Sequence, residues 1–529
     1  MTARPAVASN LQLSGLDEIA GNSTVANTMS FTFNLTQDNS WYDASSGSYD
    51  AVWIFMKYSI DGGITWRHAH MAGSGINPAG FSIPTQFQNQ YEIIVPTDQT
   101  GFFIQRTGPG SGSITLSGIQ FVWNYGQDGV STPAAQAAST LNSIYGVEMV
   151  YIPQGAFHAG DGNGTFSLEY PLGGSIPWYI QNESALTTTL SGGPYYYQNT
   201  GASGDEYTTG QVFTIPASFP KGYNAFYLMK YELTEGQWVS FFNTLPVASR
   251  SSRDITSSTQ GGKNSQAVVS RNTISWNSSI PASPAATLRP SRPVSFVSWP
   301  DVAAYAAWAG LRPITELEFE KAARGKDSQS VQGEFVWGST SIAPATTGGI
   351  TPNSDETGAE TMSDASNINA YAGGFTTGDG RGGGTASGQA GPLRVGIFAA
   401  SSTNPTRLSS GAGYYGNMEL SGNLAQPVVG IGRPESVGNF QGSHGTGNLS
   451  ASGFATNSDW PGFNNSTSQV DGTIGIGYRG GDFQSPNTTP LMTSARTFAV
   501  RDPDSQGCAQ RYASGCAVFQ GGRLGRSAS

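Results

Sequence analysis

The stretch that decides the fold is G-L-R-P-I-T-E-L-E-F-E-K-A-A-R-G, residues 310–325. Thr315 is a favourable N-cap residue and Glu318 follows three positions later, which is the spacing of a capping box. Apolar residues at positions 317, 319, 322 and 323 give the helix faces that can pack against a core. Gly325 then supplies the left-handed residue at which helices commonly end. The stretch therefore predicts a short, capped and packed helix.

Further motifs stand on both sides of this helix, from a predicted opening strand to a terminal G-R-L. They are V-Y-I-P-Q-G-A-F (150–157), F-Y-L-M-K-Y-E-L-T-E-G-Q-W (226–238), R-P-V-S-F-V-S-W-P-D (292–301), F-V-W-G (335–338), G-N (422–423), R-G-G (479–481) and G-R-L (522–524). Together with residues 310–325 they resemble the formylglycine-generating, or sulfatase-modifying factor, family over roughly residues 146–526. The resemblance implies an irregular, loop-rich variant of the C-type lectin fold.

The region before these motifs is predicted to be all-β. Residues 51–60 and 64–68 are rich in β-branched and aromatic residues and flank an Asp-Gly-Gly turn, which is a hairpin signal. Residues 102–106 and 114–123 predict further strands, spaced as in a β-sandwich.

The whole chain is therefore predicted to be α+β, an all-β sandwich followed by the lectin-like domain. The predicted divisions are a sandwich at 1–126, a linker at 127–142 and the lectin-like domain at 143–529, with insertions near 158–212, 246–290 and 340–392.

Composition narrows the class of protein. The chain has 529 residues, of which 70 are Gly and only 12% are charged, and its net charge is -10. Much Gly with few charges is typical of turn-rich secreted or virion proteins. The acidic balance and the lack of a basic run argue against a nucleic-acid partner or an anionic membrane surface.

No export or membrane signal is visible in the sequence. No segment reaches the ~18 consecutive apolar residues that span a bilayer. The first 20 residues lack the continuous apolar region of a signal peptide. We therefore expect a protein that is assembled in the cytoplasm and released by lysis, as a phage virion component is, and located on a virion or extracellular surface. Export by another route remains the alternative.

The chemistry that the resemblance implies is missing from the sequence. Members of the family that make formylglycine use two cysteines shortly after the R-G-G motif to bind copper, and thiolates select Cu(I). Ser485 and Pro490 stand at those two places. Cys508 and Cys516 lie some 18 or more residues beyond the expected positions, so we predict no copper site and no oxidase activity. Whether these two cysteines form a disulfide or stay free thiols is left open.

The resemblance also implies calcium. The segment E-L-S-G-N-L-A-Q, residues 419–426, is similar to the family's D-M-x-G-N-V-W-E calcium motif. Carried over, the ligands are Glu419, the carbonyls of Gly422 and Leu424, and Gln426. A fainter second site would use Asn367 and the carbonyl of Phe398, with Gly396 where an Asp is expected. Calcium affinity grows with carboxylate charge, so Gln426 weakens the site. The alternative is that these residues form hydrogen-bonded turns.

A binding surface is expected in the segment 484–519, which some relatives of this fold use to display ligand-binding residues. It offers aromatic, Arg and Gln side chains of the kinds suited to recognition, namely Phe498, Arg501, Gln510, Arg511 and Tyr512. In the alternative interpretation Phe498 and Phe519 are core residues and the arginines pair with Asp502 and Asp504.

Three functional hypotheses follow from the sequence. The first is a non-catalytic structural or receptor-binding protein, most simply a phage decoration, fibre or tail-associated component. Its partners would be copies of itself or other structural subunits, and a cell-surface glycan or protein receptor. The second is a secreted bacterial adhesin with the same domains. The third, an active copper-dependent formylglycine-generating oxidase, would need the cysteine pair.

Overall fold

The computed structural model describes most of the chain. The described residues are 10–19, 25–161, 168, 176–190, 194–197, 212–257, 262–280, 284–326, 330–342, 352–353, 361–362, 369–370, 372, 391–401, 405–432, 434–483, 485, 488–496, 498 and 516–528.

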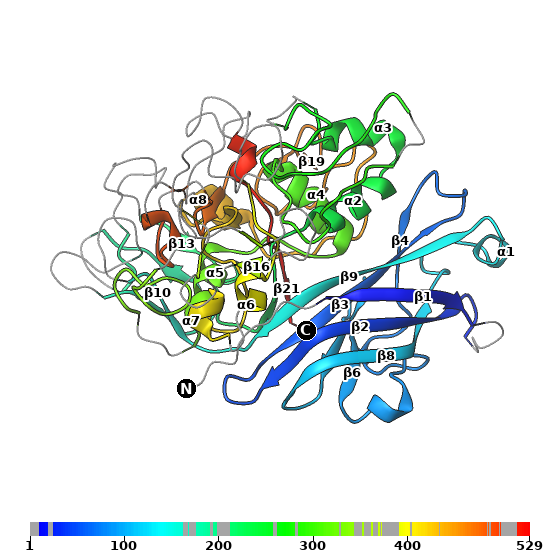
Figure 1. Ribbon diagram of the computed structural model, residues 1–529, viewed down its shortest axis with the longest axis horizontal. Helices are drawn as coiled ribbons and strands as arrows, with labels where there is room; N and C mark the ends of the chain where they lie inside the picture. The colour runs from blue at the N-terminus through cyan, green and yellow to red at the C-terminus, as the bar shows by residue number, and fades with distance from the viewer. Residues whose placement is uncertain are drawn as a thin grey trace.

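One large sheet organises the molecule (Figure 1). Its main path runs through β21 (Gly525–Ser527), β14 (Phe226–Met229), β9 (Leu141–Ile152), β3 (Ser48–Ser59), β7 (Phe102–Arg106), β6 (Tyr91–Val95) and β5 (Gly75–Ile76). Joined to this path are β1 (Gln12–Glu18), β2 (Met29–Asp43), β4 (Arg67–Ala69) and β8 (Gly110–Trp123). All the pairings within this sheet are antiparallel.

The N-terminal region is all-β, as predicted, and encloses a core of its own. Strand β2 pairs with β3 only at Tyr42↔Tyr49 and Asp43↔Ser48, and then runs alongside β8. The side chains of Phe33, Ile54 and Phe121 are buried in the core that these strands share. The predicted hairpin is present as β3 and β4, with Lys57 opposite His68.

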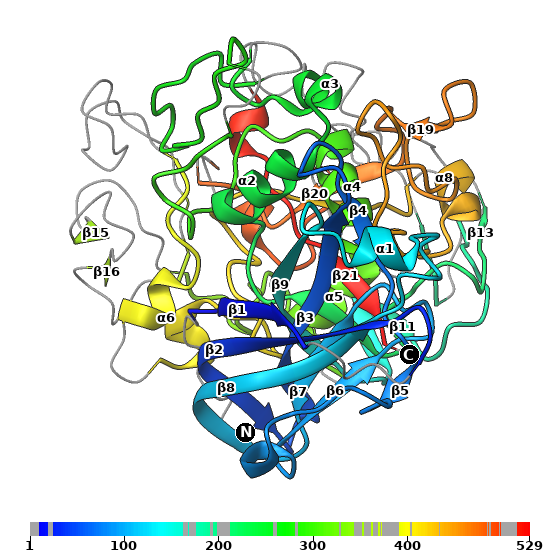
Figure 2. The ribbon, with the colours of Figure 1, turned by 90° about the vertical axis from the view of Figure 1, so that its right-hand side faces the viewer.

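The sheet is continuous across the predicted linker. Helix α1 (Thr132–Ala135) lies within residues 127–142, and β9 begins at Leu141. Strand β9 then pairs with β3 from Ser59↔Leu141 to Tyr49↔Tyr151. Figure 2 shows β3 and β9 running from the all-β region toward the helices of the second region. The division of the chain at residues 127–142 stays a prediction, and the two regions share one sheet.

The second region combines helices with short strand pairs. Its helices are α2 (Glu235–Thr244), α3 (Val247–Arg250), α4 (Trp299–Ala309), α5 (Glu316–Arg324), α6 (Ile397–Ser401), α7 (Arg407–Ser410) and α8 (Pro434–Asn439). Single turns of 3-10 helix lie at η1 (Thr85–Phe87) in the first region, and at η2 (Ser251–Arg253), η4 (Thr489–Leu491) and η5 (Cys516–Phe519) in the second.

The short strands of the second region pair two by two. The pairs are β10 (Phe157–Ala159) with β11 (Trp178–Ile180), β12 (Leu186–Thr187) with β13 (Thr214–Ile215), β15 (Pro352–Asn353) with β16 (Thr361–Met362), β17 (Gln426–Val429) with β20 (Ile476–Arg479), and β18 (Phe463–Asn464) with β19 (Gln469–Val470). Among the described residues, no helix is long and apolar enough to cross a membrane.

Helix α5 begins where the sequence predicts. The Thr315 hydroxyl accepts the Glu318 amide at 3.1 Å, and the Glu318 carboxylate accepts the Thr315 amide at 3.0 Å, so the capping box is complete. All nine residues of the helix are buried, its charged residues included. Charges buried in this way require partners, because an unpaired ion inside a protein is costly.

The two regions pack through a common core. The indole of Trp53 donates to the Ala309 carbonyl at 2.8 Å. The Lys57 ammonium donates to the carbonyls of Trp308 and Gly447, both at 2.6 Å. Gly310 ends α4 with φ 68°, and a Cβ there would come within 3.2 Å of Thr100. The all-β region is therefore a structural part of the surface on which α4 and α5 rest.

Candidate functional site

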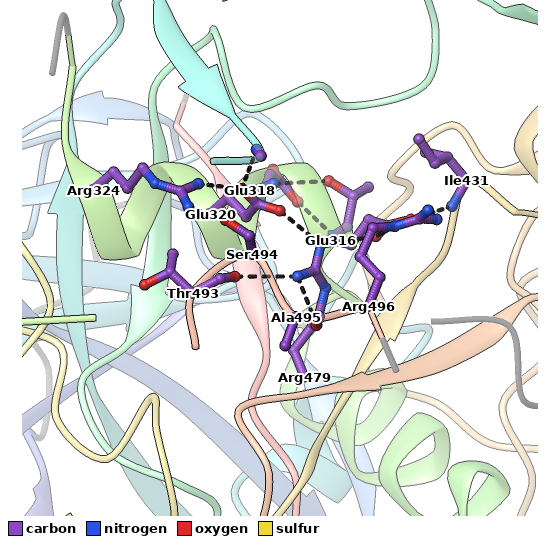
Figure 3. Close-up of polar contacts among 12 residues, drawn as sticks. Glu316, Glu318, Glu320, Arg324, Ile431, Arg479, Thr493, Ser494, Ala495 and Arg496 are labelled. Atoms are coloured by element: carbon purple, nitrogen blue, oxygen red, sulfur yellow. Dashed lines mark hydrogen bonds and ion pairs between the residues drawn. The ribbon is translucent and has the colours of Figure 1, made fainter. Parts of the chain in front are cut away.

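A buried ion-pair network fixes the R-G-G turn to helix α5 (Figure 3). The guanidinium of Arg479, at the end of β20, donates to Glu316 and to Glu320, both at 2.8 Å. Arg496 donates to Glu316 at 2.8 Å from the following segment. Arg324 pairs with Glu320 and, at 2.5 Å, with Glu334. Because Glu316 and Glu320 lie one helical turn apart, they receive Arg479 together.

The charges within this network are balanced locally. Burial would raise the pKa of Glu316, but Arg496 and Arg479 outweigh it and hold the pKa at about 2. The Ile431 amide donates a further hydrogen bond to this carboxylate at 2.7 Å. Glu316 therefore stays ionised at neutral pH and acts as a structural anchor for the turn.

The turn after Arg479 contains the two positions at which the resembled family has cysteines, and both lie beside Gly481. Gly481 has φ +64°, and a Cβ built on it would lie 3.0 Å from the Ser485 hydroxyl and 3.2 Å from the Pro490 carbonyl carbon. Ser485 is fully buried, and its hydroxyl accepts the Asp482 amide at 3.0 Å. Residue 485, through its side chain, and residue 490, through its backbone, thus both lie beside Gly481, and their side chains are a hydroxyl and a pyrrolidine ring.

The first predicted calcium residue is buried with one carboxylate oxygen unsatisfied. One Glu419 oxygen accepts the Gly396 amide at 2.8 Å. The other, Oε2, is buried and has no hydrogen-bond partner among the described residues. Burial raises the pKa of Glu419 to about 7, although Arg523 and the Gly396 amide act in the opposite direction. A buried carboxylate oxygen without a partner is a place for a proton or a cation.

Gln426, the last predicted ligand, is already tied to its neighbours. Its amide nitrogen donates to the Glu419 carbonyl at 2.6 Å, and its amide oxygen accepts Arg523 at 2.7 Å. The Arg523 guanidinium also donates to the Met418 carbonyl at 2.5 Å. A protein donor therefore occupies the amide oxygen that calcium would use. Of the carried-over ligands, Glu419 has an oxygen to offer, whereas Gln426 is engaged.

The calcium motif and the R-G-G turn are neighbours in space. The Gly422 amide donates to the Gly480 carbonyl at 2.7 Å, and Gly480, at φ +88°, leaves no room for a Cβ beside the Leu420 carbonyl. Leu424 donates its amide to Glu232 at 3.0 Å. The predicted calcium residues and the turn that follows Arg479 are thus parts of one buried region.

Of the remaining predicted residues, some pack in or against the core and others lie outside the described residues. Phe398 is buried in α6, and Phe498 is half-buried, packs against the core and accepts the Tyr478 amide at 2.9 Å. Phe519 is buried against Phe483 with ring centroids 5.3 Å apart, which agrees with the alternative that it is a core residue. Outside the described residues lie Asn367, Arg501, Cys508, Gln510, Arg511 and Tyr512; of Cys516 only the backbone, in η5, is described.

Sequence reasoning missed one residue of this region, Glu232. It is fully buried, and it accepts the Asn423 side-chain amide at 2.6 Å and the Leu424 amide at 3.0 Å. Burial raises its pKa well above the usual range, and Arg523 lowers it only in part. The sequence signal that could have indicated Glu232 was an acidic residue between two hydrophobic ones, Tyr231 and Leu233, both of which are buried in the structure.

Comparison with known proteins gives matches to part of the chain. A family model described as "Sulfatase-modifying factor enzyme 1-like domain" matches residues 179–371. A "Formylglycine-generating enzyme" of Thermomonospora curvata is 52% identical over 52 residues, which are 10% of this chain and 16% of the relative. One of Streptomyces coelicolor is 62% identical over 39 residues, 7% of this chain and 12% of the relative. The matched segments thus span less than a fifth of the length of either relative.

Proposed function

Since this chain carries a sulfatase-modifying factor-like domain, recognised over residues 179–371, we propose that it uses the domain as a non-catalytic scaffold. The proposed role is a structural or receptor-binding protein of a surface assembly, most simply a decoration, fibre or tail-associated component of a phage virion. The proposed partners are further copies of the chain or other structural subunits, and a cell-surface glycan or protein receptor.

One observation carries the proposal. Ser485 and Pro490 surround Gly481, at the places where the resembled oxidases have cysteines. A serine hydroxyl is a hard and weakly acidic ligand, and proline has no side-chain ligand, so the pair offers Cu(I) neither of the thiolates that it prefers. The rest of the turn is kept by the buried pairing of Arg479 with Glu316 and Glu320. A scaffold retained without its reactive groups is what a binding or assembly protein requires.

The finer fold belongs to the same proposal. We propose that the first region is a β-sandwich and the second an irregular C-type lectin-like domain, with the loops between its short strands as display sites. The first part is supported by a separate hydrophobic core that the all-β strands enclose. The second is supported by small strand pairs around two buried helices, α4 and α5. Long loops on such a core commonly bind ligands or neighbouring subunits.

A secreted bacterial adhesin is the alternative, because the same composition and scaffold would serve it. Imaging of the native particle with an antibody against this chain separates the two. Labelling of phage particles supports the virion role, whereas labelling of intact bacterial surfaces in the absence of phage supports the adhesin.

The non-catalytic part of the proposal is tested by copper binding and oxygen consumption. The purified chain, offered Cu(I) and a cysteine-containing sulfatase peptide, should bind no copper at this site and consume no oxygen. The matched variant carries Ser485→Cys together with Pro490→Cys, and because it supplies the two thiolates that Cu(I) prefers we expect it to gain Cu(I) binding. Peptide oxidation by the unaltered chain would overturn the proposal.

Calcium is proposed as a weakly held structural ion. The Glu419 carboxylate and the carbonyls of Gly422 and Leu424 would hold it, and the ion would supply positive charge to the buried Oε2 of Glu419. Gln426 does not fit the set, because Arg523 occupies its amide oxygen. We therefore expect an affinity no tighter than about 10⁻⁴ M, as for calcium sites with few charged ligands.

A further inference from the structure

A polar cleft opens on the second region, away from the R-G-G turn. Its volume is 780 Å³, and it lies between residues 438–441, 458–466 and 471–474. None of the residues of the Arg479 network or of the calcium motif lines it. Ligand pockets for small molecules and short oligomers have volumes of about 300–1,000 Å³.

The cleft has a fixed frame. Trp460, only 2% exposed, is held by hydrogen bonds from its indole nitrogen to the Ser443 carbonyl at 2.9 Å and to the Ser443 hydroxyl at 3.1 Å. The Gly472 amide donates to the Gly462 carbonyl at 3.0 Å. Gly462 has φ +75° and lies close to Gly472. A Cβ on Gly462 would come within 2.1 Å of the Gly472 carbonyl oxygen. The two loops are therefore locked at the base of the β18–β19 hairpin.

Two carboxylates in the lining are oriented by hydrogen bonds. Asp459 accepts the backbone amides of Gln441 at 3.1 Å and Ser443 at 3.2 Å. Asp471 accepts the Thr467 hydroxyl at 2.7 Å. Asp459 also accepts the Ser443 hydroxyl, and Asp471 the Asn464 side-chain amide at 3.5 Å. Because a carboxylate can accept about four hydrogen bonds, each still has at least one acceptor site for a ligand.

Other polar side chains of the lining are free to bind a ligand. The side chains of Asn439, Gln441, Ser458, Asn465 and Ser466 form no hydrogen bond within the described part of the chain. Amides offer both donors and acceptors, and hydroxyls do the same. Phe463, half-buried, adds an aromatic ring to the wall. Among the described residues that line the cleft there is no Lys or Arg.

We infer that this cleft binds a neutral glycan. A sugar ring presents neighbouring hydroxyls, which donate to carboxylates and accept from side-chain amides, and an apolar C–H face, which packs on an aromatic ring such as that of Phe463. The lining matches each of these groups. Sialylated, sulfated or phosphorylated sugars are disfavoured, since the described lining presents two carboxylates to them and no cation. The inference rests on the proposed binding function, whose ligand class and site it specifies.

The test uses the full-length chain on an array of neutral hexose and N-acetylhexosamine oligosaccharides, printed beside sialylated and sulfated glycans. We expect binding to at least one neutral glycan and to no anionic one. Calorimetry with the bound glycan then compares Asp471→Asn and Asn465→Ala with the control Asn448→Ala, an exposed residue outside the lining. Each cleft variant should weaken binding about 10-fold, as expected for one lost hydrogen bond to a ligand.

The failure of this inference can be told apart from failure of the proposed function. Attachment of the chain to host cells or its incorporation into particles tests the function, and neutral glycans as competitors test the cleft. Attachment that neither cleft variant nor any neutral glycan reduces would overturn the cleft and leave the function standing. Glycan binding that Asn448→Ala weakens as much as Asp471→Asn would place the site elsewhere and also overturn it.

Discussion

Glu419 and Glu232 are both buried, and the charge of Glu419 raises the electrostatic cost of ionising Glu232. The cation that acts on both acids, Arg523, directs its hydrogen bonds to Gln426 and to backbone carbonyls. It therefore lowers the pKa values of the two acids through space without pairing with either. The pKa of Glu419 is raised to about 7, so this carboxylate takes up a proton near neutral pH.

Replacing Glu419 should flatten the dependence of stability on pH. Burial raises its pKa from 4.5 to about 7, so between these values the folded chain binds more protons than the unfolded chain and stability falls as pH rises. Glu419→Gln keeps an acceptor for the Gly396 amide and removes the ionisation. Relative to the unaltered chain, the variant should gain about 3 kcal/mol between pH 4.5 and pH 8. Urea unfolding at both pH values measures this, and parallel curves would contradict it.

Calcium should act through the same carboxylate. Millimolar CaCl₂ should raise the melting temperature at pH 8, where Glu419 is largely ionised, and leave it unchanged at pH 5, where a proton occupies the site. Glu419→Gln should abolish the effect at pH 8, and equal MgCl₂ serves as the control ion. A shift that survives in Glu419→Gln would place any calcium elsewhere.

At this scale the sequence identified some residues and not others. The motif at 419–426 pointed to Glu419, Gly422 and Gln426, because motif spacing is visible in one chain, and their role as calcium ligands stays a prediction. Glu232 was missed, since its partners Asn423 and Leu424 lie almost 200 residues away and no local pattern links them.

Helix α5 is the element in which local rules and tertiary contacts agree. Its start at Thr315 and its end at Gly325 follow from capping, and the structure confirms both. Complete burial of its charged residues was not visible in the sequence, because amphipathic spacing predicts one buried face. The deciding partners, Arg479 and Arg496, come from segments more than 150 residues further along the chain.

Removal of Arg479 should destabilise the fold strongly. Arg479→Leu leaves Glu316 and Glu320 buried and short of a partner, and breaking a buried pair costs about 3–5 kcal/mol. Arg479→Lys keeps a charged nitrogen for the two carboxylates but loses the hydrogen bonds that Nη1 donates to the carbonyls of Thr493 and Ala495, so it should lose less stability than Arg479→Leu.

A double variant provides the control for this prediction. Glu320→Gln combined with Arg479→Leu removes one of the stranded charges, so part of the loss should return. Guanidinium unfolding of the unaltered chain, of Arg479→Leu and Glu320→Gln alone, and of the double variant measures the differences. Independent, additive effects of the two substitutions would show that this pairing is not the cause.

The whole molecule depends on the sheet that both regions share. Strand β3 lies between β7 and β9, and all of its residues are buried. The side chains of Trp53 and Phe55 belong to the core of the second region, while Ile54 belongs to the core of the first. The sequence predicted the strands near residues 51–60 and 150–157 but not their pairing, because strands 90 residues apart carry no local signal of register.

Separation of the two regions should therefore unfold the first. A fragment of residues 1–126 lacks β9, which pairs with β3 from Ser59↔Leu141 to Tyr49↔Tyr151, and it would expose Trp53 and Phe55. We expect the fragment to be disordered or aggregated, and the full chain to unfold in one transition. Circular dichroism and a two-dimensional amide spectrum of the fragment check this. A well-dispersed spectrum with a cooperative melt would instead establish an independent domain.

The contacts around β3 also bear on the rate at which this protein forms. Trp53 meets Ala309 across 256 positions of the chain, and Lys57 meets Gly447 across 390. Contacts of such long range slow folding, because much of the chain must be ordered before they can form. The same enclosure means that the central strand can be released only by opening both cores, so unfolding should also be slow. We expect a protein that reaches its native state late and then persists, with a lifetime set by its unfolding barrier rather than by equilibrium stability alone.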